Sequence, residues 1–400
     1  MKILYIHPVG VFGGATKSLV EMMAALPVNE IASTVIVPRG TATASLEAVG
    51  ASVIEVAGLY KWDNTRFSYY RGLRWLILLR EFYYLIPTLL GLLCAKRKGP
   101  FDIIHCNEIS AILPALLAKK IFKAPLIMHV RSLQRSDPQN FSTRFVISLI
   151  EKYVDEVVAI DEAVRQTLPV ELPVTVIYNG LQVPDITERP KDNREFVIAI
   201  IGVLIRGKGV WEFVKAAQFL KKLDLPIKML VVGENPHVLK GLRGWLLKKF
   251  NFAEDIRQDL EDYVKLNKLE ELVTFTGFQK DIELVYSNID ALCFPSHLDA
   301  PGRPVFEAAL YGLPSIVAMK NPTEDVIIDG QTGLIVDQPE AKMIADCIAY
   351  LATKRDTARA MGVAARSLAV NRFDRQVTAS QMMKLYTKLY GGGCRKSNPS

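Results

Sequence analysis

Short apolar runs alternate along this chain with longer segments whose apolar residues recur at helical spacing. Residues 3–6 predict a buried strand, Gly13-Gly14 breaks the pattern, and 16–26 predict an amphipathic helix. Apolar runs without alternation are typical of parallel strands covered on both faces. Further strands are expected at 34–37, 102–106, 126–130, 156–160 and 174–178. This strand–helix order predicts a doubly wound α/β sheet.

The pattern stops at residues 183–195, which are polar, contain two prolines and show no apolar period. Such a composition indicates a linker between domains. Beyond it, strands are expected at 196–202, 227–233, 273–275, 291–294, 315–318 and 333–336, and helices at 210–220, 341–353 and 373–389. The chain of 400 residues is too long for one ordinary core. We therefore predict α/β domains at 1–185 and 186–372, a helix at 373–390 and a disordered tail at 391–400.

Half of the residues are hydrophobic and 23% are charged, which is a globular composition. The net charge is +7, and basic residues cluster in pairs and a triplet at 96–98, 119–120, 221–222 and 248–249. Because these clusters adjoin apolar helices and form no long basic tract, they favour an anionic membrane surface over nucleic acid as a partner.

The five cysteines show no metal-ligand spacing, and the N-terminus passes directly into a strand. Unpaired cysteines are typical of a reducing compartment, and the start of the chain lacks the features of a signal peptide. We expect a cytoplasmic protein, peripheral on the inner face of the cell membrane.

Residues 66–98 form an apolar and basic insertion in the first predicted domain. The apolar part, 82–95, is shorter than the ~20 residues that span a bilayer, and Arg80-Glu81 interrupts any longer stretch. Three interpretations stay open: a helix lying on a lipid surface, an ordinary core helix and a transmembrane helix, of which the first two are favoured. Residues 237–250 show a similar basic and apolar mixture.

The segment at 296–314 carries the strongest chemical signal. Pro304 suits the first turn of a helix, Glu307 lies about one turn further, and Asp299 precedes the helix. Amides at 302–305 would then point out of the helix start, where phosphate or sugar oxygens bind. Two carboxylates beside such a site suit a nucleoside diphosphate sugar. The alternative is an ordinary acidic helix start with a glutamate on the helix face.

This segment resembles the E-x7-E motif of retaining glycosyltransferases of family 4, which have the GT-B fold. The residues in register are Pro295-Ser296, Gly302, Glu307-Ala308, Gly312 and Pro314. The resemblance implies two Rossmann-like domains facing across a cleft, with the C-terminal helix packing back on the first. It also implies that Glu307 binds the ribose. Position 299 with the following backbone would hold the sugar, within a donor site that includes Gly302, Arg303, Pro304 and Val305. Asp299 is shorter than the usual glutamate, and Pro301 replaces an aromatic residue.

Other family segments occur in order along the chain. Residues 202–209 resemble the segment that receives the pyrophosphate, with Lys208 matching and Arg206 assigned the charge of an arginine that is Val203 here. Gly13-Gly14 resembles a glycine loop near the donor phosphates, which makes Gly14 a donor-binding residue. His129 resembles a strand-end histidine that reaches the transferring sugar, and His105 is interpreted as structural. Gly277 and Phe278 resemble a loop against the nucleobase.

The resemblance implies transfer of a sugar, with retention, from a UDP- or GDP-linked donor to a glycan or lipid-linked acceptor in exopolysaccharide or related assembly. His129, Asp299 and Lys208 are the expected catalytic residues of this hexosyltransferase. Closure about the linker would bring His129 and Gly14 to the donor. No Asp-x-Asp follows a strand, so we predict metal independence and no cofactor. The alternatives are a non-catalytic nucleotide-sugar-binding member of an assembly complex and an epimerase.

Overall fold

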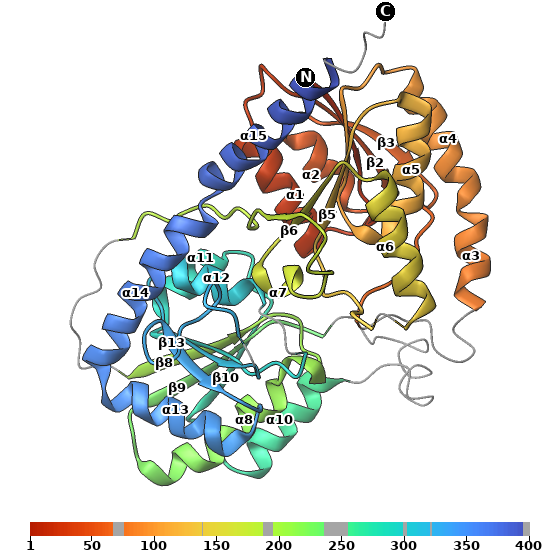
Figure 1. Cartoon of the computed structure of the whole chain (residues 1–400). Coiled ribbons are helices and arrows are strands. Elements are labelled where there is room, and N and C mark those ends of the chain that lie inside the picture. The colour runs from red at the N-terminus through yellow and green to blue at the C-terminus, as the bar shows by residue number, and fades with distance from the viewer. Residues whose placement is uncertain are drawn as a thin grey trace, which may run out of the picture. The chain divides into compact units, whose positions relative to one another are not determined.

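The computed structural model describes residues 1–66, 76–137, 139–186, 195–235, 255–298, 302–320 and 322–394. The chain divides into two compact units, each described by itself (Figure 1). Unit 1 comprises Met1–Gln182 with Arg372–Ser400, and unit 2 comprises Val183–Asn371. The predicted basic helix at 237–250 lies outside the described residues. The disordered tail predicted at 391–400 is helical up to Cys394, contrary to the prediction, and its remainder lies outside the described residues.

Unit 1 contains a seven-stranded parallel sheet in the order β3-β2-β1-β4-β5-β6-β7. Its strands are β1 (Lys2–Ile6), β2 (Ala32–Pro38), β3 (Ser52–Val56), β4 (Ile103–Cys106), β5 (Leu126–Val130), β6 (Glu156–Ala159) and β7 (Val174–Val176). The sequence predicted all of them except β3. This edge strand carries the exposed Ser52 and Glu55, which break the apolar run. The strand order reverses beside β1, which pairs with β2 on one side and β4 on the other.

Helices cover both faces of this sheet (Figure 1). One face is covered by α1 (Gly14–Ala25), α2 (Ala42–Ala48) and the last helix, α15 (Arg375–Cys394). The other is covered by α4 (Leu85–Lys96), α5 (Ile112–Phe122) and α6 (Phe141–Tyr153), with α3 (Ile77–Tyr83) before α4 and the short α7 (Glu162–Arg165) after β6. The C-terminal helix α15 packs on α1 and β4 within this unit.

The predicted insertion at 66–98 contains α3 and α4, which form the crossover from β3 to β4. By length and composition alone, the helical stretch Ile77–Lys96 is long and apolar enough to cross a membrane, whereas the sequence predicted that Arg80-Glu81 limits the apolar part to a shorter length. Glu81 turns inward, is 3% exposed, and accepts hydrogen bonds from Arg80 and from the Lys61 N–H. The helix is briefly interrupted at Tyr84 because Pro87 has no backbone N–H to donate to the carbonyl of residue 83.

Unit 2 contains a six-stranded parallel sheet in the order β10-β9-β8-β11-β12-β13. Its strands are β8 (Phe196–Ile201), β9 (Ile227–Val232), β10 (Val273–Gly277), β11 (Ala291–Phe294), β12 (Ser315–Ala318) and β13 (Gly333–Val336). Its helices are α8 (Val210–Leu220), α10 (Ile256–Leu266), α11 (Ile282–Asn288), α12 (Arg303–Leu310), α13 (Ala341–Thr353) and α14 (Arg355–Phe373). All six strands were predicted, as were α8, α12 and α13, whereas α10, α11 and α14 were not.

Candidate functional site

The first group of predicted residues lies in unit 2, where β8 and β11 are neighbours and the strand order reverses. Ligands of open α/β sheets bind at such a switch point, beyond the carboxyl ends of the strands. The loops that follow β8 and β11 are tied together there. The Ser296 hydroxyl and the His297 N–H both donate to the Gly207 carbonyl, at 3.2 and 3.0 Å. Residues 207 and 296, far apart in sequence, therefore form one edge of the candidate site.

Glycine is required at the end of the β8 loop. Gly209 has a φ of +72°, and a Cβ there would lie 1.7 Å from the Pro295 carbonyl oxygen. Any side chain would combine backbone strain with a backbone clash. The close approach that glycine permits sets the start of α8 against the β11 loop.

Lys208 extends back from the 3-10 turn Arg206–Lys208 toward the end of β8. A Cβ atom added at Gly202 would lie only 2.8 Å from the Lys208 Nζ, so the amine lies close to the backbone at the end of β8. Burial lowers the pKa of this half-buried amine, and no carboxylate of the described residues forms an ion pair with it. A partly desolvated cation of this kind favours an anionic ligand. Arg206 differs, because its exposed guanidinium lies over the Trp211 ring, 5.5 Å from the centroid.

Glu307 lies one turn into α12, with Gly302 as the N-cap and Pro304 in the first turn, as predicted. One carboxylate oxygen accepts from Arg303 Nε at 2.7 Å, and the other accepts from the Tyr286 hydroxyl at 2.8 Å. The Glu307 side chain is 16% exposed. Tyr286 is buried and stacks on Tyr311, and burial followed by the charge of Glu307 raises the pKa of its phenol. The carboxylate is therefore held in a fixed orientation.

The prediction that the amides from Gly302 to Val305 all point out of the helix is wrong for two of them. The Val305 N–H donates to the Gly302 carbonyl at 2.9 Å, and Pro304 has no N–H. Gly302 has a packing role, since a Cβ there would lie 2.2 Å from Cζ of Phe294. Asp299, the other predicted carboxylate, lies outside the described residues.

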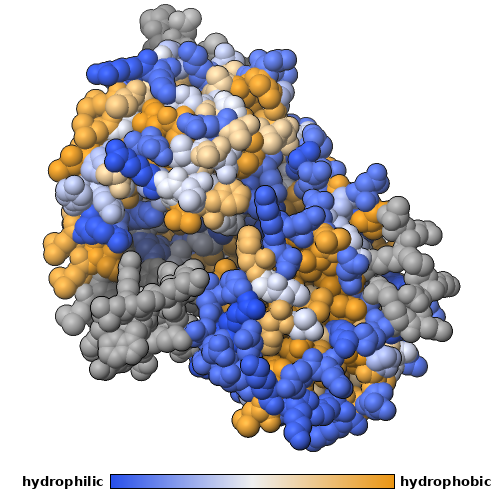
Figure 2. Space-filling model, turned by 180° about the vertical axis from the view of Figure 1, so that it is seen from behind, coloured by the Kyte–Doolittle hydropathy of each residue, from blue (hydrophilic) through white to orange (hydrophobic). Residues whose placement is uncertain are grey.

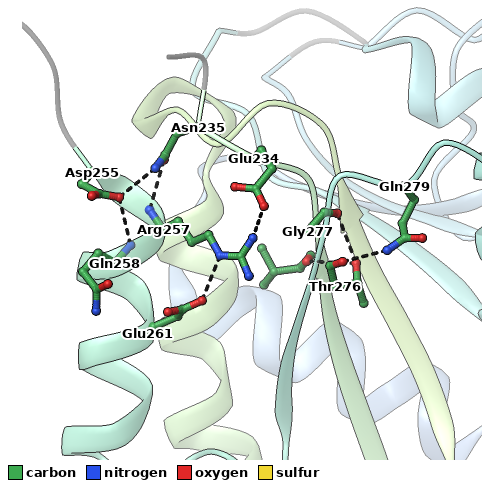
Figure 3. Close-up of polar contacts among 10 residues, drawn as sticks. Glu234, Asn235, Asp255, Arg257, Gln258, Glu261, Thr276, Gly277 and Gln279 are labelled. Atoms are coloured by element: carbon green, nitrogen blue, oxygen red, sulfur yellow. Dashed lines mark hydrogen bonds and ion pairs between the residues drawn. The ribbon is translucent and has the colours of Figure 1, made fainter. Parts of the chain in front are cut away.

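The predicted nucleobase loop follows β10 (Figure 3). Phe278 is 75% exposed, and Gly277 has a φ of +71°. Beside them, Arg257 of α10 is held between Glu234 and Glu261, and these carboxylates raise the pKa of its guanidinium (Figure 3). Sequence reasoning missed this polar cluster, although Glu234 directly follows Gly233, the last residue of the strand predicted at 227–233.

The second group of residues lies in unit 1, at the carboxyl ends of β1, β4 and β5. Asn107 donates to His7 Nδ1 at 2.9 Å and accepts from Arg131 Nε at 2.8 Å. His129 is 3% exposed, and its Nε2 has no hydrogen-bond partner among the described residues. Burial, followed by the nearby charge of Arg131, lowers the pKa of His129 well below 6.5, so its imidazole is neutral. Sequence reasoning singled out His129 but missed His7 and Arg131 as parts of the network around it.

Gly14 begins α1, beyond the end of β1, with Gly13 as the N-cap. A Cβ on either glycine would meet no atom within 4 Å. Packing within the unit therefore does not require these glycines, and they leave an open surface at the helix start. Within the described ranges, no three His, Cys, Asp or Glu side chains gather in a way that suits a metal ion.

Two families match consecutive parts of the chain. Residues 12–183 match Glycosyltransferase Family 4, and residues 184–368 match Glycosyl transferases group 1. The boundary between the matches adjoins the boundary between the two structural units.

The chain is also similar to individual glycosyltransferases. It is 24% identical over 318 residues to the capsular polysaccharide biosynthesis glycosyltransferase CapM of Staphylococcus aureus, covering 74% of this chain and 78% of that protein. It is 24% identical over 314 residues to the phosphatidyl-myo-inositol mannosyltransferase of Mycobacterium leprae, covering 74% and 76%.

Among solved structures, HepE from Anabaena in complex with UDP superposes with a TM-score of 0.74 at 20% identity, over 97% of this chain and 100% of that one. The two parallel-sheet units and this likeness establish the GT-B fold. The chain therefore belongs to these glycosyltransferase families, and it is a family 4 glycosyltransferase of glycan biosynthesis with the GT-B fold.

Proposed function

We propose that this enzyme transfers a hexose, with retention and without a metal ion, from a UDP- or GDP-linked donor to a lipid-linked glycan in polysaccharide assembly. The observation that carries the donor assignment is the pairing of two groups at one sheet edge. Lys208 supplies a half-buried ammonium with no carboxylate ion pair among the described residues, and Glu307 supplies an oriented carboxylate. A diphosphate between a ribose and a sugar matches these charges. The UDP bound to HepE supports the same donor class.

The proposed chemistry needs charge stabilisation on the leaving group. The bond from the anomeric carbon to the phosphate oxygen breaks, and its electron pair stays with the diphosphate. The acceptor hydroxyl attacks the same face of the sugar and passes its proton to a departing phosphate oxygen. Lys208 stabilises the charge that develops there, which is electrostatic catalysis by a fixed donor. Glu307 accepts hydrogen bonds from the ribose hydroxyls, and His129 donates from Nε2 to the sugar.

The other donor-site residues have smaller proposed roles. Gly277 and Phe278 lie against the base, Gly14 leaves room for phosphate oxygens, and Arg206 adds positive charge beside them. Asp299 keeps its predicted place at the donor sugar. Because protein cations supply the charge, no bound metal is required for the transfer.

A panel of UDP- and GDP-sugars tested by thermal shift would identify the donor. A ligand at about 100 times its Kd stabilises the folded state by about 2.7 kcal/mol, which raises Tm by several degrees. We expect one donor class to give such a shift and to be turned over in the presence of EDTA, with an α-linked donor giving an α-linked product by NMR. No shift with any nucleotide sugar would contradict the assignment. Binding without turnover would support the non-catalytic alternative.

The acceptor proposal rests on the outer face of α3 and α4. Residues Ile77–Lys96 form a helical stretch of 20 residues, broken only slightly at Tyr84, and an 18-residue window of this stretch has a mean hydropathy of 1.5 and is 22% buried. Large apolar side chains more than half exposed recur at spacings of three and four. They are Leu79, Phe82, Tyr83, Ile86, Leu90 and Leu93. Figure 2 shows hydrophobic side chains along the margin of the molecule where these helices lie.

The opposite face of α4 is fastened to the sheet. A Cβ on Gly91 would lie 2.7 Å from Cγ1 of Val56, and Thr88 accepts a hydrogen bond from the Tyr60 N–H at 3.0 Å. Because one side packs on β2 and β3, the stretch lies along the surface of unit 1 with its apolar stripe outward. An exposed stripe of this length on a soluble surface indicates an interaction site.

Charge at one end of the stripe supports an anionic bilayer as the partner. Three exposed basic residues lie at the end of α4: Lys96 is its last residue, and Arg97 and Lys98 follow. Lys120 and Lys123 lie at the end of α5, which contacts α4 and leads into the strand beside β4. An apolar stripe next to a basic cluster is the pattern of a helix lying in the membrane interface. This surface would keep the enzyme beside a lipid-linked acceptor at the cytoplasmic face.

Flotation with phosphatidylglycerol-containing vesicles tests this surface. We expect the wild-type enzyme to float, and the Phe82→Glu/Leu90→Glu variant to stay in the soluble fraction. Removing two basic residues with Lys96→Gln/Arg97→Gln should weaken partitioning about thirtyfold, since each contributes about 1 kcal/mol near an anionic surface. Vesicles of phosphatidylcholine alone should bind weakly.

Matched controls come from unit 2. Leu266→Glu/Val363→Glu introduces the same charge at exposed apolar sites, and Lys222→Gln/Lys265→Gln removes the same charge at exposed lysines. Both should float like the wild type. A wild-type enzyme that fails to bind anionic vesicles, or stripe variants that bind them fully, would rule out this surface.

A further inference from the structure

A buried chain of polar side chains connects the C-terminal helix of unit 1 to His129. The hydroxyls of Tyr5 and Tyr386 are 3.1 Å apart, and the Tyr386 hydroxyl is 2.7 Å from His105 Nδ1. His105 Nε2 is 3.2 Å from His129 Nδ1. All four side chains are at most 3% exposed. Tyr386 belongs to α15, whereas both histidines lie on neighbouring strands of the sheet.

The contact with Arg131 indicates the direction of the hydrogen bonds in this chain, and His105, which is closer to His129 Nδ1 at 3.2 Å, maintains that direction. The Arg131 Nη2 is 3.4 Å from His129 Nδ1, and a guanidinium can only donate. His129 Nδ1 therefore accepts, and a neutral ring must then carry its proton on Nε2. It follows that His105 donates from Nε2. His105 Nδ1 accepts from the Tyr386 hydroxyl, whose oxygen accepts in turn from Tyr5.

The histidines and tyrosines of this chain of hydrogen bonds all stay neutral. Burial holds the pKa of His105 at about 3 and that of His129 well below 6.5, and Arg131 lowers both further. The remaining titratable neighbours, Tyr5 and Tyr386, have pKa values raised by burial and stay neutral. With both imidazoles neutral, the property that the chain can set is the tautomer of His129.

We infer that Tyr386 is a positioning residue: acting through His105, it holds His129 in the Nε2–H form, so that His129 donates a hydrogen bond to the bound donor sugar. This inference rests on the proposed function for its ligand. The His129 Nε2 is buried and has no partner among the described residues, which leaves its N–H available for a ligand. The opposite tautomer would present a lone pair at the same position.

Two Tyr→Phe variants separate this role from simple packing, because they remove the same atom from the same buried cluster. Tyr386→Phe deletes the donor to His105 Nδ1, so His105 can reverse its tautomer and turn a lone pair toward His129. Tyr5→Phe deletes only a hydroxyl that donates to the Tyr386 oxygen. Nitrogen-15 NMR of the ring nitrogens is the direct measurement, and only five histidines need to be assigned.

We expect His129 to be the Nε2–H tautomer in the wild type and in Tyr5→Phe, and a mixture of tautomers in Tyr386→Phe. With the donor that the panel selects, kcat should fall about tenfold in Tyr386→Phe, equivalent to one lost hydrogen bond, with KM nearly unchanged. In Tyr5→Phe, kcat should stay within about twofold of the wild type. The NMR result does not need a donor, so it stands apart from the proposed function.

A second pair of variants makes the same test at His105, which lies between Tyr386 and His129. This pair still tests the inference if the Tyr386→Phe protein does not fold. His105→Gln keeps an N–H that can donate to His129 and should retain most of the activity. His105→Leu removes that donor and should match Tyr386→Phe. An unchanged His129 tautomer in Tyr386→Phe would overturn the inference, and so would equal losses of kcat in the two Tyr→Phe variants.

Discussion

Replacement of Glu307 by alanine is expected to lower donor affinity by about 10²–10⁴-fold, the largest loss from any single residue of the site. Two hydrogen bonds from ribose hydroxyls to a carboxylate are each worth about 1.5–3 kcal/mol. The carboxylate is already oriented by Arg303 and Tyr286, so little conformational entropy is lost when the ribose binds. Calorimetry with the donor identified by thermal shift measures the effect directly.

Alanine has a second consequence, which Glu307→Gln separates from the first. Alanine leaves the buried Tyr286 hydroxyl without this acceptor, which costs about 1–3 kcal/mol of stability. Glutamine keeps an acceptor oxygen for Tyr286 but loses the negative charge that binds two hydroxyls. We expect Glu307→Gln to unfold near the wild-type Tm and still to lose most donor affinity.

Asp346→Asn is the matched control for Glu307. It removes a carboxylate from an i,i+4 pair with Lys342 on the exposed face of α13. Exposed pairs of this kind contribute about 0.3–0.5 kcal/mol, so neither affinity nor Tm should change measurably. If Glu307→Gln binds the donor as tightly as Asp346→Asn does, Glu307 is not part of the donor site.

The sequence predicted those site residues that lie at or after the carboxyl ends of strands. Lys208 lies in the loop after β8, His129 is the penultimate residue of β5, and Glu307 lies in the helix after β11, so local pattern places each of them near the carboxyl edge of a sheet. Apolar runs located all strands except β3, whose exposed Ser52 and Glu55 interrupt the run.

Local sequence pattern could not predict the residues that fix the orientation of these side chains. Tyr286 reaches Glu307 from a different helix, 21 residues earlier, and Tyr386 reaches His105 across 281 residues. Neither tyrosine belongs to a short motif, and each looks like an ordinary apolar position of an amphipathic helix. Only the folded packing shows that their hydroxyls contact polar groups of the site.

The prediction that Arg80-Glu81 limits the length of the apolar stretch was wrong for a related reason. A charged pair ends an apolar stretch when each charge is assumed to need water. In the structure, Glu81 is satisfied internally by the Lys61 N–H and by its neighbour Arg80. The helix therefore continues through the pair and extends the exposed apolar stripe, which the sequence pattern had shortened.

Lys208→Met is expected to change activity and stability in opposite directions. The ammonium acts on charge that develops as the diphosphate departs, so its removal should lower kcat by about 10²–10³-fold, with a smaller effect on donor affinity. Without a ligand, burial already disfavours the charged form, as the lowered pKa of Lys208 shows. An uncharged side chain of similar length should therefore raise the Tm of the ligand-free enzyme.

The sign of the stability change also follows from proton linkage. Because the pKa of Lys208 is lower in the folded state than its ordinary 10.5, the unfolded chain binds more protons, and this residue makes stability increase with pH as the solution approaches that value. Lys208→Met should remove that part of the pH dependence.

Lys215→Met is the control for Lys208, since it removes an exposed lysine of α8 whose Nζ lies 5.6 Å from the Trp211 ring centroid. It should leave kcat and the ligand-free Tm close to wild type. A side chain that serves packing alone would lower both Tm and kcat when replaced. A higher Tm together with a lower kcat in Lys208→Met would instead show that the fold holds this cation at a cost in stability, for an anion that arrives with the substrate.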